Sequence, residues 1–323
     1  MSTGGRPAPI ERPGEVFPFE TEALLLNTLP TIKRARGYRL YGEDNKRYID
    51  FYQEGGKALL GHRPPGWTRV LKSTGSRGLF ASYPTLFSRR ARKAALSLFP
   101  WAADALFFPG LWEALSFLLS LRKECPVPGM FSLRCVDPLR DSEEELKRED
   151  TVPLWRPFGM DKDTEKELVG GEWGRWCIPV LPVPGGMGPV LLLDIHGSGT
   201  GGAAIREEAF ETEETPALPP ISALQEDLAV KAISGLKAYL HSTDKEMWSA
   251  FDLPSVVRLG PYLLFRREEG ESGDAYHRLF VQMREKGVLL PPDPRLPAII
   301  PAEFTDGEVK PLIRVLRRSY ADR

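Results

Sequence analysis

The sequence predicts a mixed α/β fold, because short apolar runs alternate with segments of helical spacing along most of the chain. Its 323 residues, 42% of them hydrophobic, suffice for a large domain together with a smaller one. Three apolar runs are typical of buried strands: 104–108, 177–186 and 188–195. The clearest amphipathic helix spans 221–241. Its apolar face holds Leu224, Leu228, Ile233, Leu236 and Leu240.

The N-terminal part of the sequence alternates loops, a hairpin and helices. Residues 1–18 are rich in Pro and Gly and are expected to form an extended arm. Two alternating runs flank a turn at 42–45, which predicts a β-hairpin over 37–51. Gly and Pro interrupt 53–67, which predicts an irregular loop that faces a ligand. Helical spacing predicts three helices: 21–35, 68–80 and 88–100.

Two later segments have the outline of phosphate-binding loops. Residues 107–123 end an apolar run at Pro109-Gly110 and restart with helical spacing, as at an anion-binding helix N-terminus. The loop GSGTGG at 197–202 follows a predicted strand, but it has no Gly-Lys-Ser/Thr and no dinucleotide spacing. We therefore expect a linker there and not a nucleotide site.

The C-terminal part predicts strands and helices in alternation. A strand is expected at 262–268, and a helix at 274–287 that ends at a glycine. A short strand from 288 and a last helix follow. Thr305 lies three residues before Glu308, which is the spacing of a capping box.

Charge balance argues against a nucleic-acid or membrane partner. The 43 basic and 44 acidic residues leave a net charge of −1, so no global field attracts polyanions. Two local basic clusters, 87–93 and 314–318, are expected to be solvated helix faces. No apolar run approaches the roughly 20 residues that cross a bilayer.

The cysteines and the N-terminal residues favour a cytoplasmic protein. Cys125, Cys135 and Cys177 are too few and too scattered for a disulfide framework or a metal knuckle. The sequence begins without the apolar core of a signal peptide. There is also no HExxH, G-x-S-x-G or CxxC motif, so metal and serine-hydrolase chemistry have no support.

Three blocks of the sequence resemble the class III, fold-type I pyridoxal-phosphate (PLP) aminotransferases, which include glutamate-1-semialdehyde aminomutase. The blocks are 34–67, which holds a "LLGHRPP" loop, 82–123, and 274–316. The resemblance implies a large domain with a mostly parallel sheet flanked by helices, and a small α+β domain from both chain ends. The segment 124–220 is much shorter than in that family.

The resemblance also implies a domain division and an assembly. Residues 1–66 would form the N-terminal arm and part of the small domain, 67–240 a shortened large domain, and 241–323 the rest of the small domain. Such enzymes are usually homodimers with a shared active site, so we expect a homodimer here.

The Schiff-base lysine that the resemblance requires is missing from its expected place. No lysine occurs between Lys166 and Lys231, where the family has it. The candidates that remain are Lys231, Lys162 and Lys57, and a solvated lysine is the simpler interpretation of the first two. His62, in the "LLGHRPP" loop, is expected to have a positional role.

The other cofactor-binding positions are also altered. Asp194 ends a buried run and resembles the carboxylate that holds the pyridine nitrogen, although a plain strand end is equally expected. His196 follows it as a ring-stacking or general-base candidate, with a surface loop histidine as the simpler alternative. Where the family has Ser-Gly-Thr/Ser before Glu-Ala, this chain has Gly110-Leu111-Trp112 before Glu113-Ala114. The hydroxyl donors of a phosphate cup are therefore absent.

The sequence thus predicts an aminotransferase-like protein with a degenerate active site that no longer transaminates. Vestigial cofactor positions are Gly110, Trp112, Glu113, Asp194 and His196. The remaining role would be small-molecule binding or interaction with a partner. The alternatives are an active PLP enzyme with an unrecognised lysine, and an interaction module whose cleft Leu111 and Trp112 fill.

Overall fold

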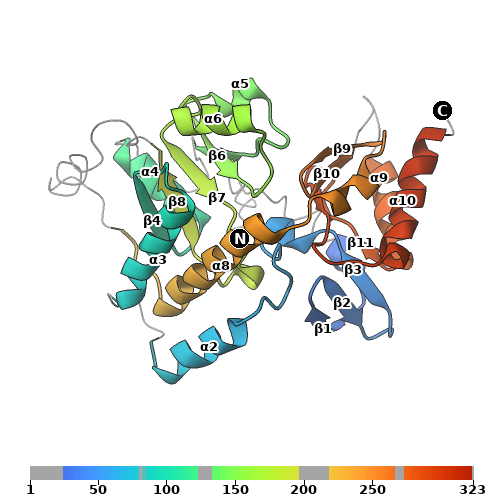
Figure 1. The fold of residues 1–323 in the computed structure, drawn as a ribbon, viewed down its shortest axis with the longest axis horizontal. Coiled ribbons are helices and arrows are strands. Elements are labelled where there is room, and N and C mark those ends of the chain that lie inside the picture. Colours follow the sequence, from blue (N-terminus) through green and yellow to red (C-terminus); the bar gives the residue numbers. More distant parts are fainter. Residues whose placement is uncertain are drawn as a thin grey trace, which may run out of the picture.

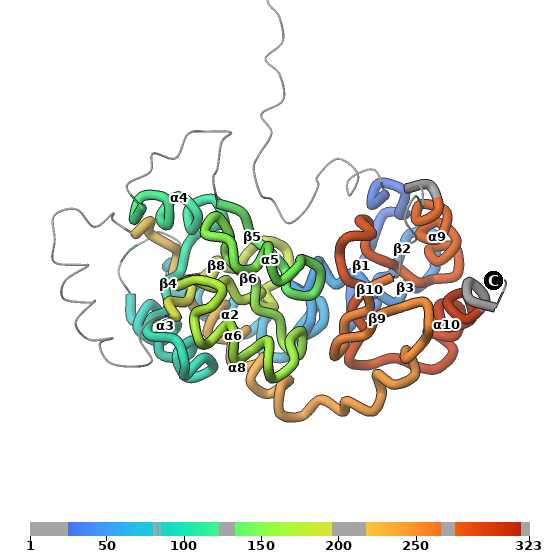
Figure 2. Tube along the Cα trace, turned by 90° about the horizontal axis from the view of Figure 1, so that it is seen from above, coloured from blue at the N-terminus to red at the C-terminus, as the bar shows by residue number. Residues whose placement is uncertain are grey.

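The protein folds into two lobes that lie side by side. The computed structural model describes residues 25–79, 83, 85–122, 133–195, 218–265 and 273–321. One lobe holds β4 to β8 with the helices α2 to α8, and the other holds both ends of the described chain (Figures 1 and 2). The linker after α8 crosses between them (Figure 2).

The larger lobe is built on a five-stranded sheet in the order β4-β8-β7-β6-β5. Its strands are β4 (Asp104–Phe108), β5 (Arg134–Val136), β6 (Thr151–Trp155), β7 (Trp176–Pro179) and β8 (Val190–Asp194). β5, β6 and β7 are parallel, whereas β8 is antiparallel to both β7 and β4. Four strands therefore run in one direction, and the predicted mostly parallel sheet is confirmed.

Six helices belong to this lobe in the described residues. They are α2 (Trp67–Ser76), α3 (Leu86–Leu98), α4 (Leu111–Leu121), α5 (Glu143–Leu146), α6 (Lys162–Gly170) and α8 (Ala223–Ser242). The expected helix over 221–241 is confirmed as α8. It begins with a capping box between Ser222 and Gln225 and buries Leu228, Ala232 and Leu236.

In the described residues, the smaller lobe contains two short sheets and two helices. The first sheet has the order β1-β2-β3-β11 and the second β12-β10-β9. The strands are β1 (Ile32–Arg36), β2 (Arg39–Gly42), β3 (Arg47–Asp50), β9 (Val256–Leu259), β10 (Tyr262–Phe265), β11 (Val288–Leu289) and β12 (Ala298–Ile299). The helices are α9 (Gly273–Glu285) and α10 (Asp306–Ala321). Three 3-10 turns, η1 (Gln53–Gly56), η2 (Pro184–Gly186) and η3 (Glu246–Phe251), connect the elements of the two lobes.

The N-terminal segment is partly different from its prediction. The hairpin is confirmed: β2 pairs with β3 through Leu40 and Tyr48, and Asn45 has the left-handed φ of 59° expected in its turn. The expected helix over 21–35 is wrong in its second half, where 32–36 form β1. Pairing with the edge of β2 satisfies the backbone there, and this outweighs the local helical spacing.

The core of the smaller lobe joins segments that are far apart in the sequence. Phe51 and Ile49 pack with Phe251, Phe280 and Leu312, all of them nearly inaccessible to solvent. The core of the larger lobe surrounds α8 and the sheet, and it extends to Tyr262 and Ile299 of the smaller lobe. The domain boundaries at residues 66 and 240 stay a prediction.

Glu308 ties the C-terminal helix to the hairpin. Its carboxylate accepts hydrogen bonds from Arg39 Nε at 2.7 Å and Arg39 Nη2 at 2.9 Å, and from the backbone N–H of Thr305 at 2.8 Å. The hydrogen bonds from Arg39 are the main cause that lowers the pKa of Glu308 to about 2, although burial of the carboxyl opposes this. The hydrogen bond from the Thr305 N–H to the Glu308 carboxylate is one of the two hydrogen bonds of the expected capping box.

A pH-dependent loss of stability follows from this carboxylate. The folded state binds the ionised form, so the stabilisation is present above the ordinary pKa of 4.5 and is lost as the pH falls through about 2. We expect Glu308→Gln to lower the free energy of unfolding by about 2 kcal/mol at pH 7. The deficit relative to the wild type should shrink below pH 4 in urea titrations. A deficit that is constant with pH would contradict the role of the charge.

Candidate functional site

The carboxyl edge of the parallel strands is closed by a buried ion pair. Asp137 follows β5 and Arg156 follows β6, and Arg156 Nε donates to Asp137 Oδ2 at 2.8 Å. Both side chains are about 95% buried or more. Ligands of open α/β sheets bind outside this edge of the sheet. Here the two charges at this edge satisfy each other.

Arg156 also reaches across to the smaller lobe. Its Nη1 donates to the carbonyl oxygen of Gly55 at 2.5 Å, and its guanidinium lies 5.8 Å from the ring centroid of Tyr262. Asp137 in turn accepts the backbone N–H of Leu139. Arg156 and Asp137 are therefore hydrogen-bonded both to each other and to backbone groups around them.

The predicted phosphate cup carries an anion of its own. Gly110 is the N-cap of α4, and a Cβ added to it would lie 2.9 Å from Glu113 Oε2. The Glu113 carboxylate thus lies against Gly110 in the first helical turn, where the helix dipole favours a negative charge. Trp112 is 44% exposed on the same turn, whereas Leu111 packs against the core of the sheet.

Asp194 lies at the opposite edge of the sheet from Gly110. Because β8 is antiparallel, its last residue pairs with Asp104 and Trp176, the first residues of β4 and β7. Arg175 holds its carboxylate with two hydrogen bonds, at 3.0 and 2.6 Å. Four residues of β4, about 13 Å, separate the two edges. His196 lies outside the described residues.

The three candidate lysines lie on three different elements. Lys162 is the first residue of α6 and is exposed. Lys231 belongs to α8, and its side chain packs against Gly66, whose φ of +85° at the start of α2 favours glycine. A Cβ at Gly66 would meet Lys231 Cε at 2.8 Å. Only Lys57, among these three, lines the cavity described next.

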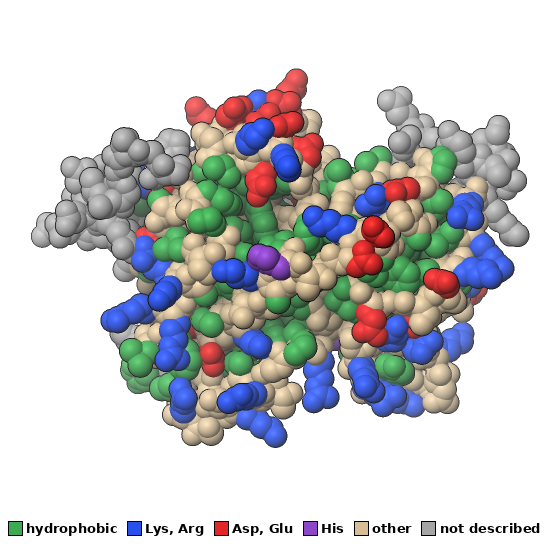
Figure 3. Space-filling model, viewed as in Figure 1, with side chains coloured by type: hydrophobic (Ala, Val, Ile, Leu, Met, Phe, Trp, Pro, Cys, Tyr) green, Lys and Arg blue, Asp and Glu red, His purple; other side chains and the backbone are tan. Residues whose placement is uncertain are grey.

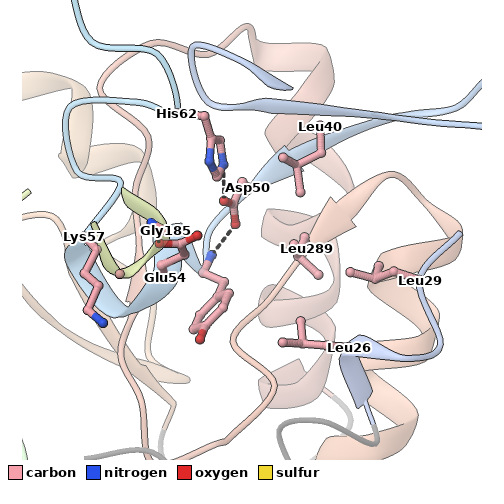
Figure 4. A pocket seen from close by; sticks show the side chains of 11 residues that line it. Leu26, Leu29, Leu40, Asp50, Glu54, Lys57, His62, Gly185 and Leu289 are labelled. Carbon is pink, nitrogen blue, oxygen red and sulfur yellow. Dashed lines mark hydrogen bonds and ion pairs between the residues drawn. The ribbon is translucent and has the colours of Figure 1, made fainter. Parts of the chain in front are cut away.

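A cavity of about 550 Å³ lies where the smaller lobe meets the loop after β7. Four leucines line it: Leu26, Leu29, Leu40 and Leu289. The polar side consists of Asp50, Tyr52, Glu54, Lys57, His62, Gly185 and Gly186. Figure 4 shows the leucines gathered on one side, with His62, Asp50 and Glu54 on the other. The cavity thus offers an apolar wall and a charged wall.

A left-handed turn presents Glu54 to this cavity. Gln53, Glu54 and Gly55 have φ values of 46°, 49° and 65° in succession. Each L-residue in this conformation costs about 1–2 kcal/mol, so the surroundings must hold the turn. Asp50 Oδ1 accepts the N–H groups of Tyr52 and Gln53, and Arg156 binds the carbonyl of Gly55.

The turn and the loop after β7 are joined through Glu54. Its Oε2 accepts the backbone N–H of Gly185 at 2.8 Å. Gln53 extends the support, because its Nε2 donates to the carbonyl oxygen of Ile299 in β12 at 2.9 Å. The cavity wall is therefore fixed from both lobes.

His62 and Asp50 form the other polar element of the wall. His62 Nε2 lies 2.8 Å from Asp50 Oδ2. Burial of the ring disfavours its charge, but the hydrogen bond to Asp50 and the charges of Asp50 and Glu54 outweigh this effect, so the pKa of His62 is raised. The pair is therefore an imidazolium–carboxylate pair over a wider pH range than an isolated histidine would allow.

Sequence reasoning missed several residues of this region. It expected a ligand-facing loop over 53–67 and a positional role for His62, but it did not select Asp50, Glu54, Asp137 or Arg156. The pair Gly55-Gly56 after two polar residues was the signal for an unusual turn. The partners of Glu54 and Arg156 lie more than a hundred residues away, beyond any local pattern.

The described ranges hold neither a metal-ligand cluster nor a membrane-spanning helix. No group of three or more His, Cys, Asp or Glu side chains there could hold a metal ion. No described helix is both long and apolar enough to cross a bilayer.

Comparison of the sequence with known proteins gives only partial matches. No family model matches the chain. An uncharacterized protein from Borreliella burgdorferi is 41% identical over 97 residues, 30% of this chain and 36% of that protein. A glutamate-1-semialdehyde 2,1-aminomutase from Heliobacterium modesticaldum is 35% identical over 69 residues, 21% of this chain and 16% of that enzyme. The matched stretches span well under two thirds of either relative.

Comparison with solved structures covers almost the whole chain. An omega-transaminase from Sphaerobacter thermophilus matches with a TM-score of 0.61 and 12% identity, over 94% of this chain and 96% of that one. N-acetylornithine aminotransferase from Stenotrophomonas maltophilia matches with a TM-score of 0.60 and 14% identity, over 93% and 98%. An ornithine aminotransferase from Toxoplasma gondii, which holds PLP at partial occupancy, matches with a TM-score of 0.57 and 13% identity, over 92% and 91%.

These likenesses bear on the fold, because their sequence identities are low. They confirm the predicted resemblance at that level over about nine tenths of the chain. The protein thus has the fold of the class III, fold-type I aminotransferases.

Proposed function

We propose that this protein is an aminotransferase-like protein that does not transaminate and binds a small ligand in the cavity between its lobes. The observation that carries the proposal is the buried pair of Arg156 and Asp137. It occupies the carboxyl edge of the parallel strands, where a ligand of an α/β sheet would lie. Opening this edge would leave a buried charge without a partner, which costs about 3–5 kcal/mol.

The described residues do not fit PLP. The cofactor needs a phosphate cup, a carboxylate at its pyridine nitrogen and a lysine near both. The cup at Gly110 has none of the hydroxyl side chains that would bind the phosphate, and Asp194 lies at the other edge of the sheet. A guanidinium, that of Arg156, follows β6 at the ligand-binding edge.

The runner-up function is a PLP enzyme that uses an unrecognised lysine. The position of Lys57 at the cavity favours it over the exposed Lys162 and the packed Lys231. The two functions differ in whether PLP forms a Schiff base at one lysine of the folded protein.

The cavity suits a ligand with an apolar body and one cationic or hydrogen-bond-donating group. The leucines offer the apolar surface, and about 0.8 kcal/mol is gained for each methylene group that they bury. Glu54 accepts one described hydrogen bond, from Gly185, so its carboxylate has capacity for a ligand donor. Asp50 is already engaged by His62 and by two backbone N–H groups.

We propose further that the protein is a cytoplasmic homodimer. Trp112 and Met187 support a dimer, because they are 44% and 42% exposed. Trp112 comes shortly after Phe108 of β4, and Met187 comes shortly before Val190 of β8. Phe108 and Val190 pair with each other at one end of these two strands. Exposed tryptophan and methionine side chains near the same end of two paired strands are typical of an interface. The cytoplasmic location is supported by the scarcity of cysteine.

The first prediction concerns PLP. Addition of PLP should give no yellow internal-aldimine absorbance, and borohydride should fix no more pyridoxyl group at Lys57 than at the exposed Lys162. Absorbance spectra and peptide mass mapping of the wild type, Lys57→Ala and Lys231→Ala measure this. Selective labelling of Lys57, lost in Lys57→Ala, would establish the runner-up function instead.

The second prediction concerns the cavity. Linear primary alkylammonium ions should raise the melting temperature, with about fourfold tighter binding for each added methylene group. The matching alkanols should bind about tenfold more weakly, because they lack the charge that Glu54 pairs with. Thermal-shift titrations measure both series.

Two variants and a control decide whether the cavity is the site. Glu54→Gln should remove the preference for the ammonium ions, and Leu40→Trp should fill the cavity and abolish both effects. Leu121→Trp is the matched control, because Leu121 is 38% exposed at the end of α4. Equal responses of Leu40→Trp and the wild type would exclude this cavity.

The third prediction concerns the dimer. Trp112→Asp with Met187→Asp should convert the dimer to a monomer, because two carboxylates would be buried in the interface. Light scattering coupled to size exclusion measures the mass. Val257→Asp is the control, at a residue that is 39% exposed in the smaller lobe. A wild-type monomer would refute the dimer.

A further inference from the structure

One long segment of the chain contains lysine and arginine but no aspartate or glutamate. Between Glu54 and Asp104 there are nine basic residues and no acidic residue. The expectation of no anionic partner was based on the near-neutral net charge of the whole chain. That total hides the excess of positive charge in this segment. Beyond about 8 Å at physiological salt, the remaining charges of the protein are largely screened, so a local excess acts by itself.

The fold places this excess on the outside of α2 and α3. Six side chains of the two helices and their ends are exposed: Arg69, Lys72, Arg77, Arg89, Arg90 and Lys93. None of the six makes an ion pair with a carboxylate of the described residues, whereas Arg92 on the inner side pairs with Asp104 at 2.6 Å. Figure 3 shows the lower left of the molecule, over α2, α3 and α8, with many basic side chains and few acidic ones.

Two described carboxylates of α8 hold these helices in place. Asp227 of α8 accepts a hydrogen bond from Thr74 of α2 at 2.7 Å. Its neighbour Glu226 accepts one from Thr85, the N-cap of α3, at 3.0 Å. These two carboxylates therefore face the inside of the lobe. They do not neutralise the exposed cations on the outside.

Large apolar side chains lie among the exposed cations. Leu86 is 70% exposed, Tyr83 69% and Leu71 38%. On α3, Leu86 shares one helical face with Arg89, Arg90 and Lys93, at spacings of three, four and seven residues. We call the surface of these nine residues, the six cations and three apolar side chains, the basic face.

We propose that the basic face docks on an anionic lipid surface as a peripheral contact. Arginine and lysine bind lipid phosphate and carboxylate groups, while exposed leucine and tyrosine enter the boundary between headgroups and acyl chains. The exposed leucines favour a membrane over a nucleic acid, because phosphate backbones are bound by cations and polar groups. This proposal is independent of the cavity and its ligand.

Vesicle sedimentation of the full chain tests the proposal. The protein should bind vesicles of phosphatidylcholine with phosphatidylserine, and not vesicles of phosphatidylcholine alone. Each basic residue near an anionic surface contributes about fivefold to the affinity. Lys72→Gln, Arg89→Gln and Lys93→Gln together should therefore weaken binding on the order of a hundredfold. Leu86→Ser should weaken it about tenfold at unchanged charge.

The matched control changes three cations on another exposed helix face. Lys310, Arg314 and Arg317 lie on one side of α10, so their replacement by glutamine alters the net charge equally. This variant should bind vesicles as the wild type does. Equal losses in both variants, or no binding to phosphatidylserine vesicles, would overturn the proposal. Binding of duplex DNA that is insensitive to Leu86→Ser, with vesicles unbound, would assign the face to nucleic acid.

Discussion

The buried contact between Arg156 and Asp137 is the constraint on which the arrangement of the two lobes depends. It couples the ends of β5 and β6 to the carbonyl of Gly55 and lies against Tyr262 of the smaller lobe. A guanidinium and a carboxylate out of water are stable only when they are paired and hydrogen-bonded. The chain between β3 and α2 must therefore follow one path, which brings Gly55 to the guanidinium.

That path explains the strained turn and the cavity beside it. Gln53 and Glu54 adopt left-handed conformations because both sides of the turn are fixed, by Asp50 and Ile299 on one and Arg156 on the other. Strain of this kind persists only where the surroundings over-determine the backbone. As a result, the Glu54 carboxylate accepts the N–H of Gly185 and lies on the polar side of the cavity, opposite the four leucines. The closed edge of the sheet and the cavity beside it therefore share one cause.

The basic face arises because the exposed cations of α2 and α3 lie outside, while two carboxylates of α8 lie inside. Carboxylates of α8 hold the inner sides of α2 and α3 through threonine hydroxyls. Among the arginines and lysines of these two helices, Arg92 alone pairs with a described carboxylate. The cations remain outside with exposed leucines between them. Near-neutral total charge therefore coexists with a strongly basic local surface.

The local elements could be predicted from the sequence, because their signals lie within a few residues. Alternation and a turn at Asn45 predicted the hairpin, and a long amphipathic pattern predicted α8. The strand, turn and helix around Gly110 were also visible, since their residues are adjacent in the chain. The strand at 32–36 was missed, because its partner β2 outweighs local spacing.

The sequence by itself therefore determined most of the elements, the family resemblance in fold and the absence of hydroxyl side chains at 110–112. Only the tertiary structure decided where charged groups meet. A strand has the same period of two in either direction, so the sequence could not tell that β8 is antiparallel and carries Asp194 away from Gly110. Nor could it pair Arg156 with Gly55 or Glu54 with Gly185, because contacts across more than a hundred residues are set by packing.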